Sequence, residues 1–366
     1  MKILYLSDTE LDITSGIAQK VLMQSNEWQK QGHDVTLLSL ESLSFFSLNG
    51  ERLTEVKNHF QRRGWKIFVH LMWSTLRLNQ LLKDKEFDVV YMRYRLYSPS
   101  LKHALKDAIQ IVEINTDDVN EYRFSSKLLY GYNKLFRSLF LRDVDGFVCV
   151  STELQQKIHQ FLKPSVVIGN GINTELYEFV PSTKTKRPSL VFIGSPNQKW
   201  HGVEKIKVLA QKLKDFDFHI IGLDGNNREN LFFHGYLENH IAKRIVQNQD
   251  VGIGTLSLYE NKMNEASPLK TRQYFAHGLP VIYAYDDTDI EQDISFLLHL
   301  PNTQKNIEVS IDMIQTFVLS IYKDNEIRYL SRNFAEMELD VKVKEKQRVE
   351  FFIRVLNGYV KDKTNE

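Results

Sequence analysis

The sequence predicts an α/β protein with two doubly wound, Rossmann-like domains that face each other across a cleft. In both halves of the chain, short apolar runs alternate with longer helical patterns, which is typical of parallel sheets covered by helices on both faces. The chain has 366 residues, more than a single core usually holds. Such sheets bind ligands beyond the carboxyl ends of their strands, so a cleft between two facing domains is the expected ligand site.

The first domain is expected over residues 1–169. Its first helix begins at Gly16 and ends at Gly32, because apolar residues recur between them at roughly helical spacing. Five apolar runs are short enough to be buried strands rather than helices. They are residues 2–8, 34–40, 87–94, 108–115 and 145–151.

The second domain is expected over residues 189–340. A polar segment, residues 170–188, precedes it; this segment starts with Asn-Gly and holds two prolines, so it is the predicted linker. A final helix, residues 341–366, is expected to pack back toward the first domain. Five further strands are predicted at residues 188–194, 217–222, 230–236, 250–257 and 279–285.

The composition is that of a soluble globular protein. The formal net charge of +1 gives the whole molecule no strong attraction to nucleic acid. The single cysteine, Cys149, fits a reducing compartment and lies in an apolar run, where a small core residue is expected. The amino-terminal apolar run is too short for a signal peptide, and no uncharged stretch is long enough to span a bilayer. We therefore expect a cytoplasmic protein.

The segment "NEASPLKTRQYFAHGLPVI", residues 264–282, holds the clearest candidate site. Ser267 suits a helix N-cap, Pro268 the first helical position, and Gly278 the position just after the helix. Lys270 then stands in the first turn, where a cation opposes the helix dipole at a cost of ~0.3–1 kcal/mol. A bound anion, most naturally phosphate, would remove that conflict. Alternatively, Lys270 is a solvated surface lysine, and its charge and spacing favour neither interpretation.

Two polar residues flank Lys270. Glu265 lies in the turn before the helix, and Gln273 lies just over one turn into it. A carboxylate beside an anion site suits the hydroxyl groups of a sugar or ribose, which need hydrogen-bond acceptors, and an amide can both donate and accept.

The segment resembles the Glu–seven residues–Glu motif of retaining glycosyltransferases with the GT-B fold, in particular the bacterial family 4 group that builds surface polysaccharides. Four other stretches resemble this group in the same order along the chain. They are "SGIAQKVLMQSNEWQKQGHDVTLL", "VVIGNGINTELY", "LVFIGSPNQKWHGVEKI" and "NLFFHGYLENHIAKRI". The resemblance covers nearly the whole chain and is weakest over residues 41–85 and 290–366.

The resemblance implies a nucleotide-sugar substrate, with a UDP- or GDP-sugar as donor and no cofactor. Glu265 would contact the donor sugar, and Lys199 and Lys270 would neutralise its diphosphate. Further donor-binding positions follow from the motifs, with Tyr236 and Leu237 flanking the base and Gln273 near the ribose. The full donor set is Gly16, Gly194, Ser195, Tyr236, Leu237, Ala266, Ser267, Pro268, Leu269 and Gln273.

The family's reaction breaks a sugar–phosphate bond without a metal ion. Negative charge grows on the leaving diphosphate, so fixed cations and helix N–H groups stabilise the transition state. In agreement, His234 and His240 have no cysteine or acidic pattern around them that would suggest a metal site.

The sequence departs from the family pattern in three places. Gln273 replaces the second acid of the motif, and Ser195 replaces an arginine. The family's histidine after the fourth strand is absent from "VEINTDD", where Asn115 or Thr116 takes its place. Asn115 could bond a sugar hydroxyl of the acceptor, and Asp117 or its neighbour Asp118 could accept the acceptor's proton, although paired loop aspartates are more often helix caps.

Two basic, aromatic segments suggest peripheral contact with the inner face of a membrane. They are residues 61–83, which include Arg62, Arg63 and Trp65, and residues 122–143. The favoured alternative is that these helices are buried in the first domain with their charges in solvent. Interleaved bases and aromatics also occur in single-strand nucleic-acid binders, but the net charge argues against a nucleic-acid partner.

The sequence thus predicts a glycosyltransferase acting on a glycan or lipid-linked acceptor in surface polysaccharide biosynthesis. One alternative is a nucleotide-sugar epimerase, which shares the architecture. Another is a non-catalytic protein that binds nucleotide-sugars or glycans, suggested by Gln273 and the absent histidine. A dehydrogenase fits least well, because no Gly-x-Gly-x-x-Gly follows the first strand.

Overall fold

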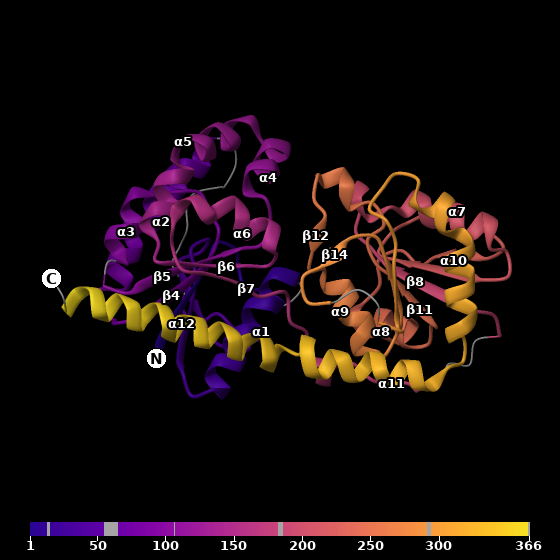
Figure 1. Cartoon of the computed structure of the whole chain (residues 1–366). Coiled ribbons are helices and arrows are strands. Elements are labelled where there is room, and N and C mark those ends of the chain that lie inside the picture. Colours follow the sequence, from indigo (N-terminus) through magenta and orange to yellow (C-terminus); the bar gives the residue numbers. More distant parts are fainter. Residues whose placement is uncertain (13–14, 55–64, 106, 182–185, 291–293, 365–366) are drawn as a thin grey trace. The chain divides into compact units, whose positions relative to one another are not determined.

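The computed structural model divides the chain into two compact units (Figure 1). Unit 1 comprises residues 1–168 and 345–366, and unit 2 comprises residues 169–344. The structure describes residues 1–12, 15–54, 65–105, 107–181, 186–290 and 294–364. The segment predicted as a linker, residues 170–188, lies within unit 2, and the chain returns to unit 1 inside its last helix.

Unit 1 is built on a seven-stranded sheet in the order β3-β2-β1-β4-β5-β6-β7. Every described pairing is parallel except that of β3 with β2. The five predicted strands all form, and the short β3 and β7 were not predicted. The strands are β1 (Lys2–Ser7), β2 (Asp34–Ser39), β3 (Ser44–Phe46), β4 (Val89–Arg93), β5 (Ile109–Ile114), β6 (Gly146–Cys149) and β7 (Ser165–Val167).

Helices cover both faces of this sheet. Successive strand residues point to opposite faces, so Leu4 joins one core with α2, α3, α5 and α6, while Tyr5 joins another with α1 and α12. Trp28 and Phe352 meet edge to face in the second core, with ring centroids 5.4 Å apart. The helices are α1 (Gly16–Lys30), α2 (Lys66–Leu81), α3 (Pro99–Ala104), α4 (Asp118–Ser125), α5 (Lys127–Asp143), α6 (Thr152–Ile158) and α12 (Val341–Thr364).

Unit 2 contains a six-stranded parallel sheet in the order β10-β9-β8-β11-β13-β15 and a small pair, β12-β14. The five predicted strands form, and β12, β14 and β15 are additional. The strands are β8 (Ser189–Ile193), β9 (Asp217–Ile221), β10 (Leu231–Phe233), β11 (Val251–Ile253), β12 (Glu265–Ala266), β13 (Val281–Tyr283), β14 (Asp286–Asp287) and β15 (Leu297–His299).

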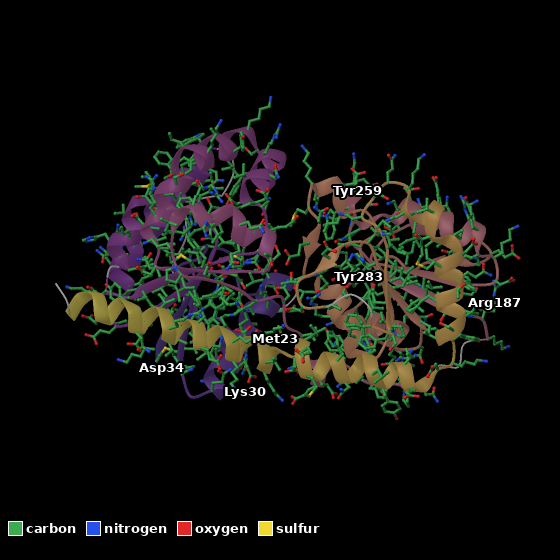
Figure 2. All side chains as sticks on the ribbon, viewed as in Figure 1. Met23, Lys30, Asp34, Arg187, Tyr259 and Tyr283 are labelled. Atoms are coloured by element: carbon green, nitrogen blue, oxygen red, sulfur yellow. The ribbon has the colours of Figure 1, made fainter. Side chains whose placement is uncertain are left out.

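The helices of unit 2 also pack on both faces of its sheet, where the side chains fill the space between layers (Figure 2). Residues of α7 and α10 share one core, and residues of α8 and α9 share the other. They are α7 (Val203–Lys212), α8 (Asn239–Gln247), α9 (Leu269–Ala276), α10 (Asn306–Ile321) and α11 (Asn325–Phe334). Among the described residues, no helix is both long and apolar enough to cross a membrane.

Each sheet has a topological switch point, which is the place where the strand order changes direction. In unit 1 the order reverses between β1 and β4, and in unit 2 it reverses between β8 and β11. The loops that leave these strands diverge to opposite faces, which opens a crevice at the carboxyl ends of the strands. The candidate residues of each unit lie in the segments that follow these strands.

The start of α9 corrects one prediction. The helix begins at Leu269, and Pro268 is its N-cap with extended φ and ψ of −74° and 135°. Ser267 is not the cap, because its Oγ accepts a hydrogen bond from the backbone N–H of Asn170 at 2.7 Å. The end is as predicted: His277 closes the helix and Gly278 follows with φ of +74°, a conformation that favours glycine.

A buried ion network fastens α12 to unit 1. Arg348 donates from Nε to Glu345 at 2.8 Å and from an Nη atom to the Tyr91 hydroxyl at 3.0 Å. Glu345 also accepts from the Trp28 indole at 2.8 Å. Arg348 and Glu345 are each about 1% exposed, so their charges depend on these partners rather than on water.

We expect Arg348→Met to destabilise the protein by about 3–5 kcal/mol, because it leaves the carboxylate of Glu345 buried without its main counterion. Arg354→Met is the matched control, since Arg354 is exposed on the same helix. The midpoint of urea unfolding measures both. Equal midpoints for the two variants would contradict a structural role for the network.

Candidate functional site

The ammonium group of Lys270 is the central feature of the switch point in unit 2. It lies 4.3 Å from the ring centroid of Phe192 at the end of β8, and 5.5 Å from that of Trp200. Although the residue is only half-buried, its Nζ is out of contact with solvent and has no hydrogen-bond partner among the described residues. Burial lowers the pKa of Lys270 to about 7. A buried ammonium without a counterion is unfavourable in the absence of a ligand.

The aromatic wall beside Lys270 was not predicted from the sequence. Trp200 and His201 belong to the 3₁₀ turn Lys199–His201, and their rings lie 4.3 Å apart. Burial and the nearby Lys270 lower the pKa of His201 to about 3, so its imidazole is neutral at physiological pH. The only sign of this aromatic wall in the sequence was that two aromatic residues, Trp200 and His201, directly follow Lys199. The side chain of Lys199 itself is exposed, so the structure gives it a different setting from that of Lys270.

Helix α9 holds Lys270 in place through its buried face. The Tyr274 hydroxyl accepts the backbone N–H of Ile193 at 2.8 Å, which ties the helix to the end of β8. Thr271 shares a hydrogen bond of 2.6 Å with the Tyr285 hydroxyl. The first turn of α9 therefore has a fixed position relative to the strand ends.

Arg272 anchors the same helix to β14 and to the loop after it. Its guanidinium is completely buried and binds Asp287 with two hydrogen bonds, one of them 2.6 Å long. It also donates to Asp289 at 2.7 Å, and Lys344 donates to the other oxygen of Asp289 at 2.7 Å. The Nε of Arg272 donates to the carbonyl of Asn170 at 3.2 Å. These contacts satisfy the charge and the hydrogen-bond donors of Arg272 within the protein, so its role is structural.

The segment before α9 is shaped by backbone pairing. Glu265 and Ala266 form β12 and pair with Asp286 and Asp287 of β14. Both residues are half-buried, as are Pro268 and Leu269, while Ser267 is buried. Pairing of β12 fixes the backbone of Glu265 four residues before the first turn that carries Lys270.

The other donor-side residues lie at the ends of neighbouring strands. Gly194 directly follows β8, where an added Cβ would lie 2.5 Å from the Phe192 ring, and Ser195 is exposed beyond it. Tyr236 is 89% exposed in the segment after β10. Leu237 is half-buried and packs against the core that includes α8 and α9.

Gln273 has a partner inside the protein. The hydroxyl of Tyr177 is hydrogen-bonded to its side chain, and the Lys243 ammonium lies 4.1 Å from the Tyr177 ring centroid. Burial, opposed by the bond to Gln273, raises the pKa of Tyr177 to about 12. The side-chain amide of Gln273 is thus hydrogen-bonded to the neutral hydroxyl of Tyr177.

Two of the three predicted acceptor-side residues of unit 1, Asn115 and Thr116, line a hollow of about 230 Å³ at its switch point. Asn115 lines it and is held by two contacts: its Oδ1 accepts from Lys20 at 2.8 Å, and its Nδ2 donates to Glu113 at 2.9 Å. Thr116 also lines it and donates to Glu121. Gly16, at the start of α1, is exposed.

Asp117 does not line this hollow and has the helix-cap role that is the commoner one for loop aspartates. Its carboxylate caps α4 by accepting the Asn120 N–H at 3.3 Å and pairs with Lys157 at 2.7 Å. Asp118 does line the hollow, but Arg137 binds it with hydrogen bonds of 2.8 and 3.0 Å. Both aspartates have structural partners, so neither is placed as a free base.

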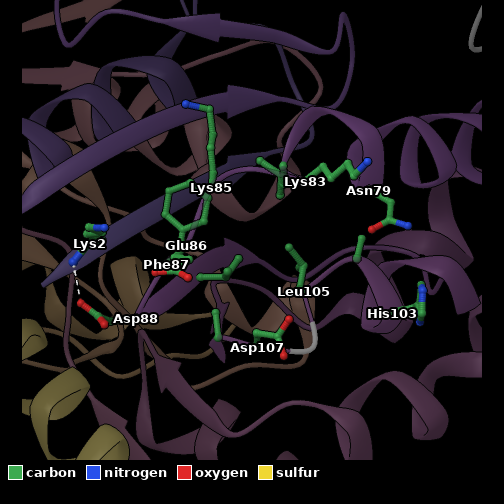
Figure 3. Close-up of a pocket in the computed structure, with 14 residues that line it drawn as sticks. Lys2, Asn79, Lys83, Lys85, Glu86, Phe87, Asp88, His103, Leu105 and Asp107 are labelled. Carbon is green, nitrogen blue, oxygen red and sulfur yellow. Dashed lines mark hydrogen bonds between the residues drawn. The ribbon is translucent and has the colours of Figure 1, made fainter.

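A second hollow of unit 1 lies at the opposite edge of the sheet (Figure 3). It has a volume of about 680 Å³ and includes Lys2 and Asp88, next to the amino-terminal ends of β1 and β4. The backbone N–H of Lys2 donates to Asp88 at 2.7 Å. Ligands of doubly wound sheets bind at the other edge, so this hollow is not the candidate site. Within the described chain, no group of three or more His, Cys, Asp or Glu could hold a metal ion.

Comparisons with known proteins agree with this geometry. Residues 14–176 match the model of Glycosyltransferase Family 4. No curated protein matches the chain.

Solved structures of the same fold include three informative neighbours. Sucrose-phosphate synthase from Thermosynechococcus elongatus has a TM-score of 0.72 and 12% identity over 98% of this chain and 100% of that chain. A glycosyltransferase from Rickettsia africae has a TM-score of 0.69 and 15% identity over 97% and 98%. HepE from Anabaena, in complex with UDP-glucose, has a TM-score of 0.63 and 16% identity over 96% and 98%.

These similarities confirm the predicted α/β fold of the GT-B type over nearly the whole chain. The match to the family model indicates the type of reaction. Together with the fold it indicates that the protein is a glycosyltransferase, as the sequence predicted. The individual site residues remain predictions from sequence and geometry.

We expect Lys270→Met to stabilise the ligand-free protein, because it removes an unpaired buried ammonium. The gain is largest below pH 7, where Lys270 is charged in both the folded and unfolded states. Above pH 7 the folded protein has lost the proton that the unfolded chain keeps up to about 10.5, so the gain shrinks as the pH rises.

The measurement is the melting temperature between pH 6 and pH 9. Lys199→Met, which makes the same change at an exposed position nearby in the chain, is the control and should shift the melting temperature little at any pH. Loss of stability in Lys270→Met at pH 6 would contradict the unpaired state of this ammonium.

Proposed function

We propose that this GT-B-fold glycosyltransferase is a retaining, metal-independent enzyme that transfers a sugar from a UDP- or GDP-sugar. The observation that carries the proposal is the unpaired ammonium of Lys270 in the first turn of α9, at the switch point of unit 2. A diphosphate is the ligand that both a buried cation and free helix N–H groups favour. HepE, a structural neighbour, is bound to UDP-glucose, which supports this class of donor.

The proposed donor site uses the residues around α9. Lys270 and the N–H groups near Ser267 and Leu269 bind the diphosphate, and Lys199 adds positive charge from the loop after β8. Glu265 accepts hydrogen bonds from the donor sugar. The exposed ring of Tyr236, with Leu237 beside it, suits contact with the nucleotide base. Gln273, held by Tyr177, offers its amide to the ribose.

The proposed reaction needs no protein nucleophile. The bond between the sugar and the diphosphate breaks, and the acceptor hydroxyl forms its new bond on the same face of the sugar. The departing phosphate oxygen takes the acceptor's proton. Lys270 and the helix N–H groups stabilise the negative charge that grows on the diphosphate, so they act on the transition state more strongly than on the bound donor.

The acceptor is proposed to be a glycan or lipid-linked sugar in surface polysaccharide biosynthesis, reached from the cytoplasmic face of a membrane. Asn115 and Thr116, which line the hollow of unit 1, are placed to bond its hydroxyl groups. Because Lys20 and Glu113 fix both ends of the Asn115 amide, its remaining N–H and lone pair have defined directions.

The surface of α2 and α5 supports peripheral membrane contact. On α5, the apolar residues Leu128, Leu135 and Leu139 are exposed, and so are the basic residues Lys127, Lys134 and Arg142. No acidic residue lies between Lys127 and Arg142. On α2, Met72 and Leu76 are exposed, and Trp65 is exposed just before it. Arg62 and Arg63 lie outside the described residues. Exposed apolar and basic side chains together favour an anionic lipid surface.

We expect the purified protein to hydrolyse or transfer sugar from one member of a panel of UDP-, GDP- and dTDP-sugars. Glu265→Gln should lower turnover about 100-fold or more with little change in nucleotide affinity, because its contact is with the reacting sugar. Lys270→Met should instead weaken binding of the free nucleoside diphosphate. Glu260→Gln, an exposed glutamate five residues earlier, is the control.

No binding or turnover of any donor would overturn the proposal. Epimerised donor sugar without added acceptor would favour the epimerase. Stabilisation by UDP or GDP with no turnover would favour the non-catalytic binding protein.

We expect the protein to bind vesicles that contain anionic lipid more tightly than neutral vesicles. Replacing Lys127, Lys134 and Arg142 of α5 with Gln should remove most of this preference, since each basic residue near such a surface contributes about 1 kcal/mol. The control replaces three exposed lysines of unit 2, Lys212, Lys214 and Lys305, with Gln. Co-sedimentation that falls equally in both variants would contradict a specific membrane face.

A further inference from the structure

One arginine of unit 1, Arg93, lowers the pKa of Glu113 through its charge without forming an ion pair with it among the described residues. Arg93, the last residue of β4, is half-buried and lines the 230 Å³ hollow at the switch point. Within the described residues its guanidinium makes no hydrogen bond, and no ion pair at contact distance. A guanidinium carries five donors and stays charged, so it is suited to a planar anion such as a carboxylate or a phosphate.

The other cations near the hollow are already neutralised. Lys20 lies 3.0 Å from Glu113, and Arg137 lies 2.8 Å from Asp118. Arg95 lies 3.3 Å from Asp8, and Arg348 lies 2.8 Å from Glu345. Three acids that line the hollow, Asp8, Glu113 and Asp118, therefore each have a cation beside them, and each of these ion pairs carries no net charge.

The sheet side of the hollow therefore carries one excess positive charge. The buried network under it contains two acids, Glu113 and Glu345, against Lys20, Arg348 and Arg93. Burial alone would raise the pKa of Glu113, but the three cations lower it well below its usual range, so its negative charge is permanent. Of the three cations, Arg93 is the one that lines the hollow.

The remaining lining offers aromatic surface and hydrogen-bond acceptors. Tyr94 is half-buried and donates its hydroxyl to Asn133 at 2.6 Å, so it presents mainly ring surface, and the half-buried Tyr122 adds a second ring. Tyr5, by contrast, is buried, with its hydroxyl on Gln24 at 3.2 Å. Glu121, on the helix side, is exposed and accepts the Thr116 hydroxyl. The hollow thus combines ring faces and an acceptor, which suit a sugar, with a single unpaired cation.

We propose that Arg93 binds an anionic group, a carboxylate or a phosphate, on the sugar that receives the transferred sugar. This rests on the proposed function, in which the hollow holds the acceptor. A bidentate contact from Arg93 would select an acidic or phosphorylated acceptor over its neutral counterpart, because the neutral sugar leaves the guanidinium without a counterion. Arg93 is then a specificity-determining residue.

The test compares binding of glucose, glucuronic acid and glucose 6-phosphate by the full-length protein in calorimetry or ligand-observed NMR. The expected result is at least tenfold tighter binding of one or both anionic sugars than of glucose. Arg93→Gln should abolish this preference, and Arg93→Lys should keep part of it because the positive charge remains. Lys270→Met should leave it intact, since that residue belongs to the donor side.

The two anionic probes separate the two sources of charge: preference for glucuronic acid alone indicates a carboxylate, and preference for glucose 6-phosphate alone indicates a phosphate. Arg77→Gln, an exposed arginine of α2, is the control. Equal or absent binding of the three sugars, or an unchanged preference in Arg93→Gln, would overturn the inference. No donor is needed, so failure of the donor panel with a preserved preference would overturn the proposed function alone.

Discussion

The buried pairing of Arg272 with Asp287 and Asp289 is the interaction on which the candidate site of unit 2 depends. Arg272 lies on α9 two residues after Lys270, and it joins that helix to the loop after β14 and to the backbone of Asn170. Removing one partner would leave a buried charge uncompensated, which is far costlier than losing a surface ion pair. The position of Lys270 is thus set by a neighbour whose own charge is fully satisfied.

The contrast between satisfied and unsatisfied cations recurs in unit 1. There, Lys20, Arg95, Arg137 and Arg348 all form ion pairs with carboxylates, whereas Arg93 forms none at contact distance among the residues that the structure describes. A protein that buries charge normally pairs it within the fold, so an exception at the carboxyl ends of the central strands indicates a partner from outside. The surroundings of the cation that forms the exception differ between the two units. Lys270 lies against aromatic rings, whereas Arg93 lies beside a buried network of ion pairs.

The sequence predicted the fold well because apolar runs and helical patterns are local signals. All ten expected strands form, but five other described strands were missed, and each is short: β3, β7 and β15 have three residues, and β12 and β14 have two. The site residues stay predictions. Lys270 was singled out because its charge opposes a helix dipole. The predicted N-cap role of Ser267 was wrong, because its Oγ is bonded to Asn170, which lies 97 positions away in the chain. The contact of Asp117 with Lys157, 40 positions away, is likewise a long-range fact that no local pattern contains, whereas its cap contact with Asn120 is local.

The ionisation of Lys270 links the structure to the proposed chemistry. In the free protein, burial lowers the pKa of Lys270 to about 7, so the ammonium readily loses its proton at physiological pH. A diphosphate beside it would raise that pKa, because a nearby anion stabilises the charged form. The leaving diphosphate gains further negative charge as the sugar departs, so the same lysine would be held most firmly in its charged form at the transition state. A fully solvated lysine, charged throughout, would bind substrate and transition state more evenly and so contribute less to the rate. Burial against Phe192 and Trp200 thus costs stability in the free protein and makes the interaction with the ligand more selective for the reacting state.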